Sequence, residues 1–133
     1  MNVVVKKLSL IADDRGWLAE VLKNELSEPI GQIHFSLSKQ GVVRGNHYHK
    51  HRIEWLFVTS GSGKIFLEEN VTGEKSELAV SGHCPVLVKI LPNVTHAIVN
   101  CGSEPMHLLV IASEKHSLKD SDIYHKLLIS TEH

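Results

Sequence analysis

The stretch Gly41-Val-Val-Arg-Gly-Asn-His47-Tyr-His49-Lys-His-Arg-Ile-Glu54, followed by Gly61 after six further residues, decides the fold. We interpret it as a β-hairpin. Successive side chains of a strand point to opposite faces, so His47 and His49 share one face, and Glu54 is expected to return to that face from the neighbouring strand. Imidazole and carboxylate groups bind divalent metal ions. This stretch therefore predicts most of a metal site.

The segment Leu91-Pro-Asn-Val-Thr-His96-Ala-Ile-Val-Asn100 predicts the missing ligand. A turn at Pro92 and Asn93 precedes a short β-branched run that carries His96. The donor set suits Zn²⁺ and equally Fe²⁺, Mn²⁺ or Ni²⁺, so it does not name the metal. The alternative interpretation is that His47 and His49 are ordinary polar residues that line a barrel. The histidines outside the predicted site are interpreted as structural or surface residues. The predicted ligands are His47, His49, Glu54 and His96.

Short β-branched runs bounded by Gly, Asn, Pro or Ser recur along the chain and predict an all-β protein. Turns at 60–63 and 70–73 are expected to join neighbouring antiparallel strands, which is typical of a small antiparallel β-barrel or jelly roll. The polar residues 114–122 are predicted to wrap the barrel. The predicted strands are Val3–Leu8, Gln32–Leu37, Ile53–Thr59, Lys64–Glu69, Val86–Leu91, Thr95–Val99 and His107–Ala112.

Length and composition predict a single domain over residues 1–133, because 42% of the residues are hydrophobic and no linker divides the chain. A formal net charge of −1 provides no basic field for nucleic acid. There is no signal-peptide pattern and no run of eighteen apolar residues, so we expect no membrane segment and a cytoplasmic location. Cys84 and Cys101 form no CxxC motif and are expected to be free thiols.

The spacing of His47, His49 and Glu54 between Gly41 and Gly61 resembles the first motif of the cupin superfamily at every fixed position. The second cupin motif is matched at His96 and Asn100, whereas Leu91 and Asn93 stand where the family has Pro and Gly. Asn tolerates a positive φ, so the turn can be kept. The resemblance implies a cupin barrel.

Two further segments resemble sugar-nucleotide cupins such as the dTDP-4-dehydrorhamnose 3,5-epimerases. These are Asp13-Asp-Arg-Gly-Trp-Leu-Ala-Glu20 and Arg44-Gly45, and the segment 44–49 with Glu54 and Asp122-Ile-Tyr124 is similar to the C-terminal cupin of capsular polysaccharide enzymes. The resemblance implies a UDP- or dTDP-linked sugar as substrate. Guanidinium groups also suit the diphosphate of such a substrate. The substrate-binding residues implied are Arg15, Trp17, Glu20 and Arg44.

The leading hypothesis is metal-dependent epimerisation or isomerisation of a nucleotide-linked 4-keto-6-deoxyhexose in polysaccharide biosynthesis, by removal of a proton next to the ketone. The catalytic candidates are His47, His49 and Tyr124. In metal-free relatives the histidine at position 47 would be the base, but a coordinated histidine cannot freely take that role. The sequence leaves both roles of His47 open, and Glu54 favours metal binding.

Three alternatives are carried with this hypothesis. The first is a sugar-nucleotide 3,4-ketoisomerase, which shares the enediol chemistry. The second is a small Fe²⁺ dioxygenase, which leaves the Arg15 and Arg44 segments unexplained. The third is a non-catalytic sugar-binding cupin. A homodimer is expected, since the apolar N-terminal strand Val3–Leu8 could add to the sheet of a partner, and the C-terminal tail could join that interface.

Overall fold

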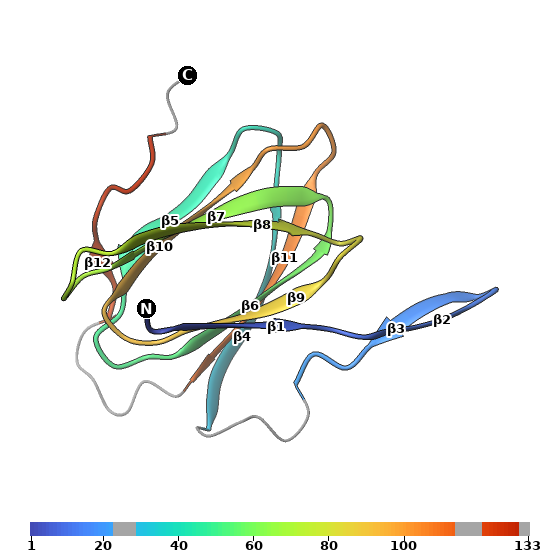
Figure 1. Cartoon of the computed structure of the whole chain (residues 1–133), viewed down its shortest axis with the longest axis horizontal. Coiled ribbons are helices and arrows are strands. Elements are labelled where there is room, and N and C mark those ends of the chain that lie inside the picture. Colours follow the sequence, from blue (N-terminus) through green and yellow to red (C-terminus); the bar gives the residue numbers. More distant parts are fainter. Residues whose placement is uncertain (23–28, 114–120, 131–133) are drawn as a thin grey trace.

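The structure, a computed structural model, describes residues 1–22, 29–113 and 121–130. Within these residues it consists of strands and turns, without a helix (Figure 1). The strands are β1 (Val3–Lys7), β2 (Leu10–Asp13), β3 (Gly16–Ala19), β4 (Ile30–Ser38), β5 (Val43–Tyr48), β6 (Glu54–Ser60), β7 (Ser62–Glu69), β8 (Lys75–Ser81), β9 (Val86–Ile90), β10 (Val94–Asn100), β11 (Met106–Ser113) and β12 (Tyr124–His125).

Two antiparallel sheets face each other, as the all-β prediction requires. The first, here called the β6 sheet, has the order β1-β9-β6-β11-β4, and the second, the β10 sheet, has the order β12-β5-β10-β7-β8. Figure 1 shows the two layers with a space between their ribbons that side chains fill. The prediction of a small antiparallel barrel or jelly roll is confirmed.

Alternation along the strands builds the core between the sheets. In β7, for example, Ile65 and Leu67 are buried, whereas Lys64 and Phe66, which alternate with them, are only partly buried. Strand β10 is buried along its whole length because it lies in the middle of its sheet. Each fully buried aliphatic side chain contributes about 1.5–3 kcal/mol. The core residues are Leu56, Val58, Ile65, Leu67, Val80, Val88, Ile90, Val94, Ile98, Met106, Leu108 and Val110.

The prediction of a β-hairpin at 41–61 is wrong in its pairing. Strand β5 belongs to the β10 sheet and β6 to the β6 sheet, so the turn at 49–53 crosses from one sheet to the other. The turn at 60–63 also changes sheets, because β6 and β7 do not pair. Glu54 therefore faces His47 and His49 from the opposite sheet, and the site spans the interior of the barrel.

The N-terminal part of the chain contains one strand that was predicted and one hairpin that was not. Strand β1 pairs with β9 of its own chain and forms one edge of the β6 sheet, so its addition to the sheet of a partner stays a prediction. Strands β2 and β3 form a separate two-stranded hairpin, which the sequence analysis did not predict and which projects from the body of the molecule (Figure 1). Leu8, between β1 and the hairpin, is buried with Trp55 and Phe57 on the outer face of the β6 sheet.

Strand β12 and the residues after it lie along β5. Tyr124 pairs with Tyr48, and His125 with His47. The prediction that residues 114–122 wrap the barrel concerns mainly residues 114–120, which lie outside the described part. Cys84 and Cys101 are free and exposed, as expected. The described residues contain no helix that is long and apolar enough to cross a membrane.

Candidate metal centre

Four side chains from three strands and one turn converge between the two sheets. His47 lies in β5 and His49 directly after it, Glu54 begins β6, and His96 lies in β10. Their potential ligand atoms all lie within 4.8 Å of one another. The Oε1 atom of Glu54 is 3.0 Å from Nε2 of His49 and 3.1 Å from Nε2 of His96. The structure thus brings together all four residues predicted as ligands.

Backbone turns beside the histidines aim them at one point. Gly45 has a φ of +98° and Asn46 a φ of +56°, and the register between β5 and β10 shifts between His96 and Ala97. This irregularity places His47 opposite His96 across the pair of strands. A β-bulge re-aims side chains in this way. In the Arg44-Gly45 pair noted in the sequence, the glycine therefore allows the irregular backbone that places His47 opposite His96.

Replacing Gly45 by alanine should disturb both stability and the cluster. An added Cβ would lie 2.7 Å from the backbone oxygen of His96 and 3.2 Å from Cα of Ala97, in a backbone conformation that also disfavours a side chain. We expect a loss above about 1 kcal/mol, seen as a fall in Tm of about 4 °C, together with weaker zinc binding. Gly73→Ala is the matched control, since its φ is +77° and nothing lies within 4 Å. Equal effects of both substitutions would exclude the clash.

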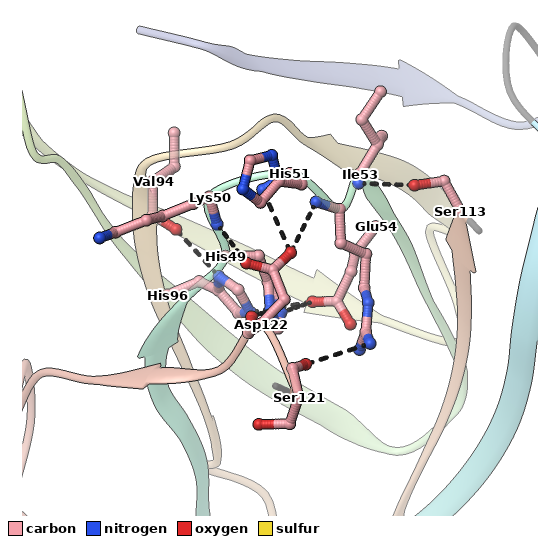
Figure 2. A network of polar contacts seen from close by, with 11 residues as sticks. His49, Lys50, His51, Ile53, Glu54, Val94, His96, Ser113, Ser121 and Asp122 are labelled. Atoms are coloured by element: carbon pink, nitrogen blue, oxygen red, sulfur yellow. Dashed lines mark hydrogen bonds and ion pairs between the residues drawn. The ribbon is translucent and has the colours of Figure 1, made fainter. Parts of the chain in front are cut away.

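Both buried histidines present the same nitrogen to the centre of the cluster. His49 holds its Nδ1 atom 2.7 Å from the backbone oxygen of Asp122, and His96 holds its Nδ1 atom 3.1 Å from that of Val94 (Figure 2). A carbonyl oxygen can only accept, so each ring carries a proton on Nδ1. The Nε2 atom then either donates a proton of its own to Glu54 or, when that proton is absent, directs its lone pair to the centre of the cluster, where a metal ion would lie. Metal-binding histidines are oriented in this manner. The residues therefore fit a divalent metal ion.

The pKa shifts within the cluster also fit a site for a positively charged ion. Burial would raise the pKa of Glu54, but the hydrogen bonds from His49 and His96 outweigh it and hold this pKa far below its usual range. Burial would likewise lower the pKa of His49, but the hydrogen bond and the charge of Glu54 raise it. Burial, together with the charges of His96 and His49, lowers the pKa of His47 to about 4. At neutral pH His47 is thus an uncharged ring beside an ionised carboxylate.

The pKa of His47 predicts a loss of stability in mild acid. Between pH 6.5 and about 4 the unfolded chain binds a proton at His47 that the folded protein does not, so protons favour unfolding. We expect His47 to lower the Tm of the metal-free protein as the pH falls through this window, whereas the raised pKa of His49 acts in the opposite sense, so the effect is measured against His47→Gln. Because His47 is only partly buried, solvent screening reduces the effect to about 1 kcal/mol, or about 4 °C. In His47→Gln this part of the pH dependence should disappear; an unchanged slope would contradict the assignment.

A cavity of about 280 Å³ opens beside the cluster. His47, Glu54 and His96 line it, as does Arg44 from the predicted substrate-binding set. His34 and Ser36 of β4 also line it, and sequence reasoning had assigned His34 to the structural or surface histidines. The alternation of β4, in which Ile33, Phe35 and Leu37 occupy the other face, was the signal that could have found them.

The other predicted substrate residues lie apart from this cavity. Arg15 and Trp17 line a separate hollow on the β2–β3 hairpin, and Glu20 follows that hairpin. The guanidinium of Arg15 is bonded to the carboxylate of Asp13, with Nε 3.0 Å from Oδ2. Within one chain, therefore, the structure does not bring Arg15, Trp17 or Glu20 to the cluster.

Tyr124 lies on the face of β12 that points away from the histidines. Its ring stacks on Tyr48, with 5.4 Å between the centroids, and the Nζ atom of Lys50 lies 4.4 Å from the ring centroid. Tyr48 alternates away from His47 in the strand, and Tyr124 pairs with Tyr48. Tyr124 is therefore not placed for the predicted catalytic role at this cluster.

The two facing antiparallel sheets and the three histidines and one glutamate between them define a cupin. The chain belongs to the family described as the polysaccharide biosynthesis C-terminal domain, whose model matches residues 11–124.

Three proteins with named functions are similar to this chain. It is 32% identical over 113 residues to the UDP-2-acetamido-2,6-beta-L-arabino-hexul-4-ose reductase of Pseudomonas aeruginosa, covering 85% of this chain and 30% of the reductase. The capsular polysaccharide assembling protein CapF of Staphylococcus aureus has 32% identity and a TM-score of 0.68, with 90% of this chain and 34% of CapF covered.

The third relative is the 3,4-ketoisomerase QdtA of Thermoanaerobacterium thermosaccharolyticum, solved as a histidine-to-asparagine variant with TDP-4-keto-6-deoxyglucose. It has 26% identity and a TM-score of 0.78, covering 94% of this chain and 88% of QdtA. The chain thus spans about a third of the length of the first two relatives but most of the ketoisomerase.

Proposed function

We propose that this chain catalyses metal-dependent epimerisation or isomerisation of a nucleotide-linked 4-keto-6-deoxyhexose in the biosynthesis of cell-surface polysaccharide. The observation that carries the proposal is the cavity of about 280 Å³ in which His47 and Arg44 lie beside the cluster of Glu54 and His96. A basic residue at the rim suits the diphosphate, and an imidazole in the interior suits proton transfer. The relatives that act on sugar nucleotides support this proposal.

We assign His49, Glu54 and His96 to metal binding. Two histidines and one carboxylate are a sufficient ligand set for a divalent ion with open positions, and both rings have an orienting carbonyl. Zn²⁺ is the ion we favour, and the donor set also accepts Fe²⁺, Mn²⁺ or Ni²⁺. When bound, such an ion supplies Lewis-acid stabilisation to the oxygen that becomes negative when a proton leaves the neighbouring carbon.

His47 is assigned the role of base. Among the described residues its ring nitrogens make no hydrogen bond that would fix the ring as those of His49 and His96 are fixed, and it lines the cavity. Its lowered pKa keeps it unprotonated at neutral pH. The negative charge that develops on the substrate next to the ring raises its affinity for the proton as transfer proceeds. The proton then returns to the same carbon or to its neighbour.

The return of the proton separates the leading function from the runner-up. Return to the opposite face of the same carbon is epimerisation. Return to the former carbonyl carbon, together with transfer of the hydroxyl proton of the neighbouring carbon to the former carbonyl oxygen, moves the ketone, as in a 3,4-ketoisomerase. The 26% identity to QdtA over 94% of this chain is the reason why ketone migration is kept as the alternative function. Product analysis by NMR distinguishes the two.

Solvent deuterium incorporation tests the proposal. The purified protein is incubated in D₂O with UDP- and dTDP-4-keto-6-deoxy sugars, before and after chelation. We expect deuterium next to the ketone, loss of exchange on chelation, and recovery on addition of the metal. Absence of exchange with every keto sugar, despite bound metal, would refute the proposal, and iron-dependent oxygen consumption would then indicate a dioxygenase.

We also propose a homodimer built on the outer face of the β6 sheet. Ile33, Phe35 and Leu37 of the edge strand β4 are 58%, 59% and 45% exposed there. An apolar edge strand of this kind tends to be covered by another chain, and a second copy would also offer its projecting β2–β3 hairpin. The Arg15 and Trp17 side chains of one copy could then serve the cavity of the other.

Light scattering tests the dimer. The chain is expected at twice its monomer mass at micromolar concentration, and Phe35→Glu should shift it to the monomer, because the substitution places a charge in the apolar face. Val71→Glu is the control, since Val71 is 82% exposed in the turn after β7. A wild-type monomer would contradict this part of the proposal.

A further inference from the structure

Asp122 contacts the candidate metal centre through its backbone oxygen and the turn beside it through its side chain. Its side chain is buried, with 1% of the residue exposed, although it lies in the segment after the barrel strands. Its carboxylate accepts hydrogen bonds from the backbone N–H groups of Lys50, His51 and Arg52, at 2.9, 3.1 and 3.0 Å. Its backbone oxygen accepts from Nδ1 of His49. Figure 2 shows Asp122 at the centre of this network.

The carboxylate fixes the turn that joins two ligands. Residues 50–52 carry the chain from His49 in the β10 sheet to Glu54 in the β6 sheet. The three successive N–H groups of this turn are partly buried in their bonds to Asp122, and backbone donors of this kind need acceptors. Asp122 supplies them with both oxygens, and the three bonds lower the pKa of this carboxyl although burial opposes the shift.

The backbone of Asp122 fixes the ring of His49. Asp122 has a φ of +55°, a left-handed conformation that Asp tolerates better than most residues. In this conformation its carboxylate and its carbonyl oxygen both bond to the segment 49–52. The carbonyl keeps the proton of His49 on Nδ1 and leaves Nε2 for the cluster.

Asn46 attaches the rest of the segment next to His47. Its Oδ1 atom accepts from the N–H groups of Leu128 and Ile129, at 2.9 and 3.1 Å, and its Nδ2 atom donates to the oxygen of Ile129 at 3.0 Å. Its backbone oxygen accepts from the N–H of Lys126. Residues 121–130 are thus bonded to the chain before His47, through Asn46, and after His49, through residues 50–52.

From these contacts we infer that Asp122 is a positioning residue of the metal centre, and that docking of residues 121–130 onto β5 and metal binding stabilise each other. The inference rests on the metal site of the proposed function but not on its reaction. Coupling of this kind is reciprocal: what undocks the segment weakens metal binding, and removal of the metal loosens the segment.

The first test measures zinc affinity by competition with a chelator. Asp122→Asn keeps the size and tolerates the backbone conformation, but its NH₂ group cannot accept the hydrogen bonds of the turn. We expect zinc affinity to fall about 10- to 100-fold, the loss typical of groups that orient metal ligands. Asp13→Asn, which removes the same charge on the projecting hairpin, should leave zinc affinity unchanged.

The second test separates positioning from general stability. In the wild-type protein, hydrogen exchange of the Lys126, Leu128 and Ile129 amides should accelerate at least tenfold when the metal is removed by chelation. In Asn46→Gly, which keeps a positive φ available, exchange of these amides should be faster still than in the chelated wild type. A residue that is only structural would destabilise the metal-free and zinc-bound forms equally. Asp122→Asn should destabilise the zinc-bound form more than the metal-free form, and the difference should correspond to the 10- to 100-fold fall in zinc affinity.

If the wild type binds zinc, either of two results would overturn the inference: zinc affinity unchanged in Asp122→Asn, or exchange in residues 126–129 that does not respond to metal in the wild type. A wild-type protein that binds no zinc would overturn it as well. A protein that binds zinc with the predicted coupling but exchanges no sugar proton would leave the inference standing and refute the proposed reaction alone.

Discussion

Zinc affinity is expected to fall more than about 100-fold when Glu54 is replaced by glutamine, because loss of a ligand exceeds the roughly 10- to 100-fold effect of losing an orienting group. The Oε1 atom of Glu54 is within 3.1 Å of Nε2 of both His49 and His96 and so lies at the centre of the cluster. A neutral carboxamide removes the only negative charge among the four side chains of the cluster. Competition with a chromophoric chelator measures the change.

Glu69→Gln is the matched control for this prediction. Glu69 is also a buried carboxylate, but its oxygens accept from the N–H groups of Val71 and Thr72 and from the Thr72 hydroxyl, in the turn after β7. Its substitution should lower the Tm while zinc affinity stays as in the wild type. If Glu54→Gln bound zinc as tightly as Glu69→Gln does, the metal centre would not be at this cluster.

The members of the cluster could be predicted from the sequence, but their arrangement could not. The spacing of His47 and His49 fixes their common face, because strand alternation is a local property. Which sheet a strand joins depends on contacts distant in sequence. Glu54 was therefore expected in a hairpin with the histidines, whereas it reaches them from the opposite sheet.

Residues outside the strand motifs were harder to interpret. Arg15 and Trp17 lie in a segment with a clear motif, but the structure shows them on a projecting hairpin, where within one chain they do not line the cavity beside the cluster. Asp122 lies in the motif noted for Tyr124, yet its contacts depend on a left-handed backbone and on a turn 70 residues earlier. Alternation and spacing carry no signal for either property.

The largest effect on catalysis is expected for His47→Asn. Removal of a general base costs about 10²- to 10⁴-fold in the rate of proton transfer. We therefore expect deuterium exchange next to the ketone of the sugar to slow by that factor. Zinc affinity should change less than the roughly 10- to 100-fold that loss of an orienting group costs, because His49, Glu54 and His96 remain. Exchange and zinc affinity are measured on the same preparation.

His83→Asn serves as the control, since His83 is exposed in the turn between β8 and β9 and should change neither quantity. Added imidazole should restore part of the exchange in His47→Asn, because a small base can occupy the space that the ring vacates beside the cavity. A variant that loses zinc together with exchange would make His47 a ligand. The base would then have to come from another group at the cavity, and His34 is a candidate because it lines the same cavity.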